Sequence, residues 1–322
     1  MKKLIIALTL TTAMSGVALA ADMAAPEYVE PAPERMNPVT GNVAIWGMYV
    51  TPSSYDHEDG DTCDDGDYSN FCEGDFGFGG DARAHYDFGN MHGLQLELLA
   101  DYHRELDDDD DTDDEHASYF AAGGHWIYRP SNYALGGFAG VSGTGHLDQE
   151  ESNVHGFIGG EAAVFMDNTT LFGQIGYNHV LGDDYDDAVK NLVFGRIGAR
   201  YFFAPNSRLE GTLAYGVSDR AEVDHDASSD DREDLDWFQV AANYEHKFEN
   251  NPFSIFTGYQ GDYVKVAEAD GDCCTESAWV HTFKVGVRMS FGGTLRDDDR
   301  YGARTFDFTN LRAPLSYADE LD

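Results

Sequence analysis

The chain has little positive charge. It contains 20 Lys and Arg residues against 59 Asp and Glu residues, and its formal net charge is −39. A nucleic-acid-binding protein needs a basic patch to meet phosphates, and none is visible. Nucleic acid is therefore not an expected partner.

Long apolar runs are also missing. After residue 20, no stretch reaches the ~18 consecutive apolar residues of a membrane-spanning helix. Gly-x-Ser-x-Gly, His-Glu-x-x-His, a phosphate-binding loop and a dinucleotide fingerprint are absent too. Hydropathy alone would describe an acidic, soluble, secreted protein. The strands of a membrane barrel escape that test, because lipid-facing and lumen-facing residues alternate along them.

The N-terminal residues have the pattern of an export signal. Lys2 and Lys3 precede an apolar segment that begins at Leu4, and Ala18-Leu19-Ala20 is a small-x-small cleavage site. We predict that residues 1–20 are a cleaved signal peptide and that the Pro-rich residues 21–40 are a flexible lead-in. Residues 41–291 follow without a linker and are expected to form one domain.

The gaps between alternating segments come in two kinds that take turns along the chain. Short, nearly neutral turns lie around Asn90, Ser131, Asn168, Asn206 and Asn251. Long acidic gaps lie around residues 53–74, 105–115, 147–153, 182–189, 219–235 and 267–276. About twelve strands fit between them, approximately at 41–51, 75–88, 92–104, 116–129, 133–146, 154–166, 170–181, 190–203, 208–218, 236–248, 253–266 and 277–291. This pattern predicts an all-β, closed, antiparallel, up-and-down transmembrane β-barrel, with periplasmic turns and extracellular acidic loops.

Two further features separate a barrel from a soluble β-sandwich, which is the alternative. Aromatic residues gather beside the short turns, as at Tyr86, Phe88 and Trp126, and a membrane interface favours such a girdle. Glycine is frequent inside the expected strands, for example Gly136-Gly137, which suits tight curvature.

The last expected strand carries the most specific motif. Residues 285–291, Val-Gly-Val-Arg-Met-Ser-Phe, alternate and end on Phe291. This resembles the C-terminal strand of Gram-negative outer-membrane β-barrel proteins, in which the assembly machinery reads the terminal aromatic residue. The resemblance covers about residues 41–291 and is specific for the barrel class, not for a function. It implies an outer-membrane location and contact with lipid. Porin-like barrels are often trimers, although no subunit-contact motif is visible in this sequence.

The chain departs from that family because residues 292–322 follow the aromatic residue. Three placements stay open for this tail: a plug in the lumen, a periplasmic segment, or another strand-like piece around residues 305–309, which alternate. The placement matters for function, because a plug would narrow or close the lumen.

Strand alternation places a mixed set of charged residues on the inner face. The expected lumen residues are Arg83, Glu97, Asp101, Glu161, Arg196, Arg200, Lys284 and Arg288. An open lumen below acidic loops predicts a porin-like channel for passive diffusion of small hydrophilic, preferably cationic solutes. The alternative is a closed barrel with a structural or surface-interaction role, in which these charges pair with one another.

The acidic loops supply a candidate collar for divalent cations, because carboxylates are the natural ligands of Ca²⁺ and Mg²⁺. Its residues are Asp59, Asp61, Asp64, Asp65, Asp107, Asp108, Asp109, Asp110 and Asp111. Their spacing matches neither an EF-hand nor a glycine-rich calcium repeat, so only weak binding is expected and no cofactor is predicted.

All four cysteines lie in the expected outer gaps, where the exported compartment favours disulfides. Cys63 and Cys72 in the first gap, paired with Cys273 and Cys274 in the sixth, would link the two ends of a closed barrel. The alternative is a Cys63–Cys72 bond beside a vicinal pair. We favour the cross-loop pairing.

A rim enzyme is the third function considered. Six histidines fall near the outer rim beside many carboxylates: His103, His116, His146, His155, His179 and His225. A His–Asp pair can activate water, but polar rim positions account for the same residues. No catalytic activity is predicted.

Overall fold

The alternating segments form twelve antiparallel strands, as the sequence predicts. The structure is a computed structural model that describes residues 38–56, 74–104, 116–146, 152–181, 189–221, 232–268 and 275–316. The strands are β1 (Val39–Asp56), β2 (Asp75–Asp87), β3 (His92–Arg104), β4 (His116–Tyr128), β5 (Tyr133–His146), β6 (Ser152–Met166), β7 (Thr169–Val180), β8 (Asn191–Ala204), β9 (Ser207–Ala221), β10 (Arg232–Lys247), β11 (Phe253–Glu268) and β12 (Thr275–Phe291).

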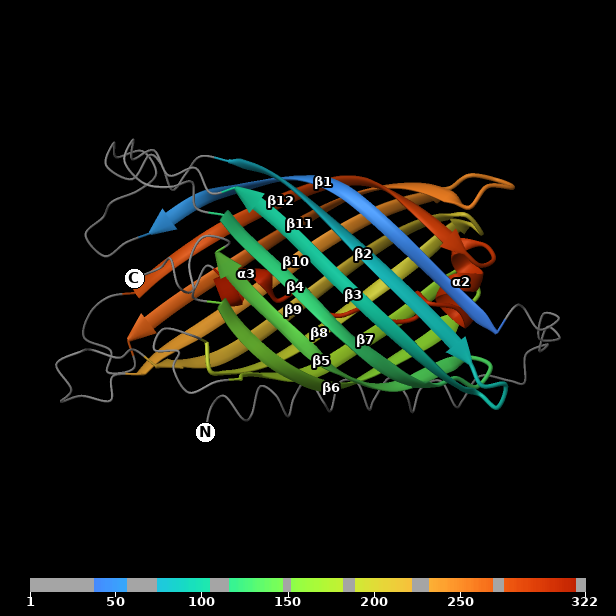
Figure 1. Cartoon of the computed structure of the whole chain (residues 1–322), viewed down its shortest axis with the longest axis horizontal. Helices are drawn as coiled ribbons and strands as arrows, with labels where there is room; N and C mark the ends of the chain where they lie inside the picture. The colour runs from blue at the N-terminus through green and yellow to red at the C-terminus, as the bar shows by residue number, and fades with distance from the viewer. Residues whose placement is uncertain are drawn as a thin grey trace. The chain divides into compact units, whose positions relative to one another are not determined.

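Each strand pairs with its neighbours in sequence, and β1 pairs with β12 to close the barrel (Figure 1). At this closing seam the register runs from Gly41 opposite Phe291 to Asp56 opposite Ser277, with one irregularity between Pro52 and Ser54. A closed up-and-down barrel is therefore confirmed. Closure leaves no free sheet edge, which a structure surrounded by lipid requires.

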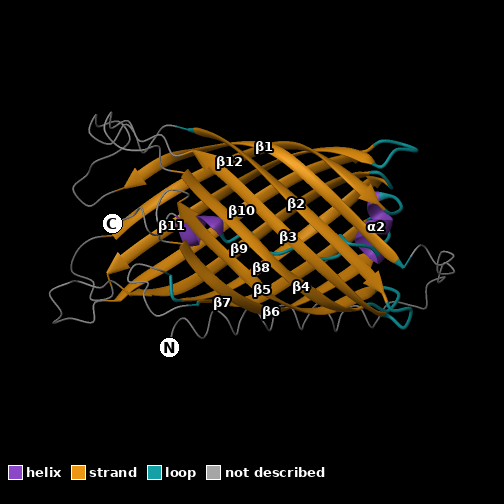
Figure 2. Cartoon of the chain, in the orientation of Figure 1, coloured by secondary structure: helices purple, strands orange, loops and turns teal. Residues whose placement is uncertain are grey.

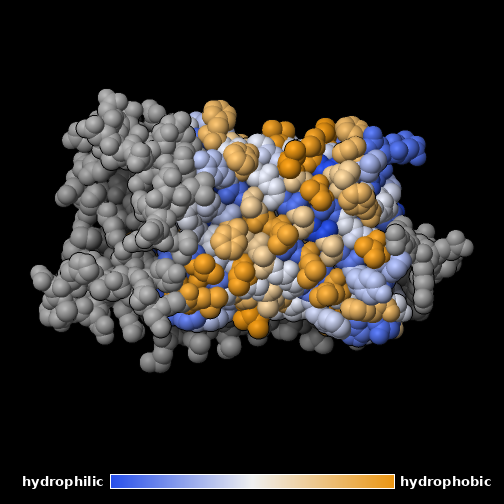
Figure 3. Space-filling model, viewed as in Figure 1, coloured by the Kyte–Doolittle hydropathy of each residue, from blue (hydrophilic) through white to orange (hydrophobic). Residues whose placement is uncertain are grey.

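The two faces of the barrel wall differ in polarity. Leu96 and Leu98 on β3 are more than half exposed on the outside, whereas Gln95 and Glu97 are buried inside. Figure 3 shows apolar residues gathered on the visible outer face. A soluble sandwich would bury that apolar face, so the sandwich alternative is wrong.

The short turns lie together at one end of the barrel, opposite the ends of the strands that lead into the long gaps (Figure 2). In the first of them Gly89 and Met91 have positive φ angles of 78° and 69°, and the Asp87 carboxylate accepts a hydrogen bond from the Gly89 amide at 2.7 Å. Exposed aromatic rings pack beside these turns, as Phe88 does on Trp126 with centroids 5.4 Å apart. The predicted girdle is confirmed at this rim.

After β12 the chain re-enters the barrel. The short helix α2 (Leu295–Tyr301) and the one-turn helix α3 (Arg312–Ser316) are joined by an irregular segment. Figures 1 and 2 show α2 at the short-turn end of the barrel and α3 near the opposite end. We call residues 292–316 the inner tail. Residues 305–309 form no strand, so that placement of the tail is wrong. In the described part of the chain, no helix has the length and apolar character needed to cross a membrane.

Candidate functional site

The candidate site is the lumen, which contains the charged wall residues and the inner tail. All eight residues expected on the inner face point into the barrel. Glu97, Asp101, Glu161, Arg196, Arg200 and Arg288 are buried, and Arg83 and Lys284 are partly buried. Burial on this scale requires partners, because an isolated buried charge is strongly unfavourable.

The turn from β12 into the inner tail has local causes. A Cβ on Gly292 would collide with the side chain of Asp298, so the close approach requires glycine. Thr294 then caps α2: its hydroxyl accepts a hydrogen bond from the Asp297 amide, while the Asp297 carboxylate accepts one from the Thr294 amide. This reciprocal pair is a capping box, which satisfies backbone donors at the start of a helix.

The inner tail follows the barrel axis away from the short-turn rim. At that rim the Arg296 amide donates to the Pro205 carbonyl at 3.1 Å. Further along, the Gln95 amide donates to the Phe306 carbonyl at 2.8 Å. Arg312, at the far end, donates to the Thr282 hydroxyl at 2.9 Å. Hydrogen bonds thus join the tail to the rest of the barrel at its start, in its middle and at its end.

Glu245 on β10 is the main ionic attachment point of the inner tail. Arg304 of the tail donates to both of its carboxylate oxygens, one of them at 2.6 Å. Arg208 and Arg288 of the wall lie 3.3 and 3.2 Å from the same carboxylate, and Ser254 donates to it at 2.6 Å. A carboxylate with this many charge-assisted donors holds its partners in a fixed geometry.

A second ionic cluster joins β8 to the tail. The Arg200 guanidinium donates to Glu210 at 2.6 Å, to Asp299 at 2.8 Å and to Asp307 at 3.2 Å. Arg196 adds a contact to Asp307 at 3.1 Å. These arginines hold the pKa of the Asp307 carboxyl well below its usual range, so that it stays ionised.

An aromatic contact fixes the middle of the tail against the other side of the wall. The Phe308 ring lies 4.4 Å from the His125 ring and 4.8 Å from the Phe157 ring, measured between centroids. His125 in turn bridges Glu97 and Glu161 at 3.3 and 3.0 Å. The tail therefore lies against β4 to β6 through apolar contact and against β8 to β10 through ion pairs.

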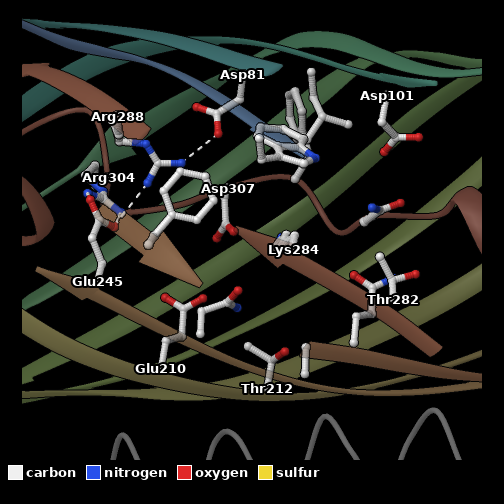
Figure 4. Close-up of a pocket in the computed structure, with 18 of the residues that line it drawn as sticks. Asp81, Asp101, Glu210, Thr212, Glu245, Thr282, Lys284, Arg288, Arg304 and Asp307 are labelled. Carbon is white, nitrogen blue, oxygen red and sulfur yellow. Dashed lines mark hydrogen bonds and ion pairs between the residues drawn. The ribbon is translucent and has the colours of Figure 1, made fainter. Parts of the chain in front are cut away.

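A cavity of about 120 Å³ remains between the tail and the wall. We call it the lumen cavity. Its lining comes from β1 to β3, β8 to β12 and the tail, and Figure 4 shows the acidic and basic side chains that face into it. Eight basic side chains line it: Arg83, Arg196, Arg200, Arg208, Lys284, Arg288, Arg304 and Arg312. Five acidic side chains do so: Asp81, Asp101, Glu210, Glu245 and Asp307.

Sequence reasoning missed the tail's own contribution to this site. Arg304, Asp307 and Arg312 were not among the expected lumen residues, because the tail had three open placements. One signal was present: a helix-capping Thr294 after two glycines, followed by a segment with four arginines. That pattern indicates a structured segment whose arginines form ion pairs with acidic residues elsewhere in the chain.

Several other expected sites lie outside the described residues. These are the signal peptide, the Asp-rich collar and all four cysteines. Signal cleavage, weak divalent-cation binding and disulfide pairing therefore stay predictions. Among the residues the structure does describe, no group of His, Cys, Asp and Glu is arranged to hold a metal ion. Of the rim histidines whose side chains are described, His155 is buried, and His179 faces the Lys190 carbonyl at 2.9 Å.

No protein-family model matches the sequence, and no curated protein sequence does. Solved outer-membrane proteins are similar in structure at very low identity. The Pseudomonas putida toluene transporter TodX has 9% identity and a TM-score of 0.38, over 79% of this chain and 90% of that one. A Pseudomonas aeruginosa FadL homologue has 9% identity and a TM-score of 0.39 over the same shares. The Escherichia coli outer membrane protease OmpT has 9% identity and a TM-score of 0.30, over 81% and 100%. The chain's own strand pairing establishes its barrel fold.

Proposed function

We propose that the protein is an outer-membrane channel for small hydrophilic solutes, and that the inner tail keeps its lumen narrow. The observation that carries this proposal is the lumen cavity, which runs beside the tail and is lined by charged and polar side chains. Such a lining replaces part of the hydration shell of a polar solute and offers little to an apolar one. Export through residues 1–20, assembly through Phe291 and contact with outer-membrane lipid are parts of the same proposal.

The two sources of charge favour opposite ions. The acidic loops, which lie outside the described residues, favour cations at the outer rim. The lumen cavity has an excess of basic side chains, which favours anions within the barrel. A reversal potential measured across a salt gradient decides between them: the cation sign assigns selectivity to the loops, and the anion sign assigns it to the cavity wall.

Planar-bilayer conductance tests the channel proposal. The variant is a chain that ends at Phe291 and so lacks the inner tail, and the control is a chain that ends at Ser316 and keeps it. Removing the tail exposes the paired wall charges to water, which solvates them, so the barrel is expected to persist. Folding is checked by the mobility of unheated and heated samples on a gel.

We expect small conductance steps from the wild type and the control, and larger steps from the chain that ends at Phe291. If that chain fails to fold, the variant Arg304→Gln serves instead, because it weakens tail docking and leaves the whole tail present. A folded tail-free barrel that passes no current in concentrated salt would overturn the proposal.

A closed barrel with a structural or surface-interaction role is the second candidate, and the many tail contacts favour it. Its acidic loops would bind divalent cations or partners. It predicts no conductance from the full chain, and steps only after the tail that closes the lumen has been removed. The absence of catalytic activity stays a prediction. Incubation of the purified barrel with lipid and peptide substrates tests it. The oligomeric state, including the trimer that the family resemblance implies, is open to cross-linking.

A further inference from the structure

Lys284 is a basic residue in the lumen, and no carboxylate of the described residues lies within ion-pair distance of its side-chain nitrogen. It lies on the inner face of β12, between Thr282 and Arg288, and lines the lumen cavity. Its ammonium group stands 5.8 Å from the centre of the Trp46 ring. Figure 4 shows it among the charged side chains that line the cavity.

Every carboxylate that lines the cavity already has an arginine partner. Asp81 lies 2.7 Å from Arg288, and Asp101 lies 3.6 Å from Arg312. The remaining three, Glu210, Glu245 and Asp307, belong to the two ionic clusters described above. The side chains that line the cavity therefore include more basic than acidic groups, and among these described basic residues Lys284 is the one that forms no ion pair within 4 Å.

We infer that the lumen cavity binds a small oxyanion, a phosphate or a short carboxylate, with the Lys284 ammonium as its main contact. This inference rests on the proposed channel function and names the class of solute. One water molecule needs about 10–15 Å³ of such volume, so a cavity of about 120 Å³ has room for a small anion and its remaining waters. A bound oxyanion would give the ammonium the charge-assisted hydrogen bonds that the wall does not supply.

The test is titration calorimetry on the purified full-length protein, with inorganic phosphate and acetate as separate probes. Three variants are compared with the wild type: Lys284→Gln, Lys284→Arg and Lys265→Gln. Lys265 lies on the outer face of β11, so its replacement makes the same charge change outside the cavity. Folding of each variant is checked by gel mobility, and Lys284→Met replaces Lys284→Gln if that variant fails to fold.

We expect saturable binding of at least one probe to the wild type. Lys284→Gln should weaken it about 10- to 100-fold, because a hydrogen bond to a charged group is lost, while the other two variants stay close to the wild type. Phosphate and acetate separate the two kinds of oxyanion. The inference is overturned if neither probe binds, or if Lys284→Gln binds as the wild type does. Binding without conductance would overturn the channel proposal alone, and conductance without binding would overturn this inference alone.

Discussion

Replacing Arg304 with glutamine removes the inner tail's double contact with Glu245. Arg304 is 1% exposed, and both of its terminal nitrogens donate to the Glu245 carboxylate. A buried ion pair that loses one partner costs roughly 3–5 kcal/mol. Glu245 keeps Arg208 and Arg288, so we take the lower end, about 3 kcal/mol, which shifts the docking equilibrium of the tail about 100-fold toward release.

Trypsin cleavage measures that shift. The tail contains further arginines at 296, 300 and 312, so a released tail is cut even after Arg304 is replaced. When release is fast relative to cleavage, the initial cleavage rate follows the released fraction, and it should rise about 100-fold. Mass spectrometry of the fragments identifies the sites. The same variant should spend more time in a large-conductance state in planar bilayers.

Arg296→Gln is the matched control. It makes the same charge change on the same segment, but Arg296 donates to the Asn168 side chain in an exposed contact at 3.2 Å. Exposed polar contacts of this kind contribute about 0–1 kcal/mol, so the cleavage rate should change by less than about ten-fold. Equal cleavage rates in Arg304→Gln and Arg296→Gln would refute the role given to the Glu245 cluster.

Three further predictions follow from the same structure. Burial raises the pKa of Asp298 to about 6, so the docked tail holds this proton more readily than a released tail. Docking should therefore strengthen by about 1.4 kcal/mol as pH falls from 8 to 5. As pH falls over that range, trypsin should cleave the wild-type tail more slowly, and the rate should change less in Asp298→Asn. Equal pH dependence in the two proteins would contradict the assignment of Asp298 as the titrating group. Phe308→Ala removes the ring that packs on His125 and Phe157 and should weaken tail docking by roughly 3–5 kcal/mol. Trypsin should then cleave the tail faster, and an unchanged cleavage rate would contradict the role given to this ring. Gly286→Ala places a Cβ against the Ile45 carbonyl and should lower the free energy of unfolding in urea by roughly 1–3 kcal/mol. The control Gly47→Ala, whose Cβ meets nothing within 4 Å, should change that free energy by less than about 1 kcal/mol. Equal effects of the two variants would contradict the close packing of β1 against β12.

The lumen is lined by polar and charged side chains, and the inner tail narrows it. Ion pairs buried in a barrel contribute little net stability, because desolvation offsets their attraction. They do fix geometry, and here they fix the position of the tail relative to β8, β9 and β10. A segment held by a few such clusters can be released by changes at single residues.

The sequence by itself determined the barrel. Period-two alternation decides which face of each strand is apolar, and it does so locally, so the strands, the closing seam and the inward position of residues such as Arg83 and Lys284 were predictable. The aromatic rim beside the short turns followed for the same reason, since a membrane interface selects residue types at strand ends.

Only the tertiary structure decided what fills the lumen. The inner tail has no period-two or helical pattern long enough to specify its place. Its partners are up to 264 residues away, as the contact between Met48 and Arg312 illustrates. Which arginine meets which carboxylate depends on the register of β1 to β12 and on the path of the tail between them. The charge balance in the cavity, where Lys284 forms no ion pair with any described residue, arises only once those long-range pairs have formed.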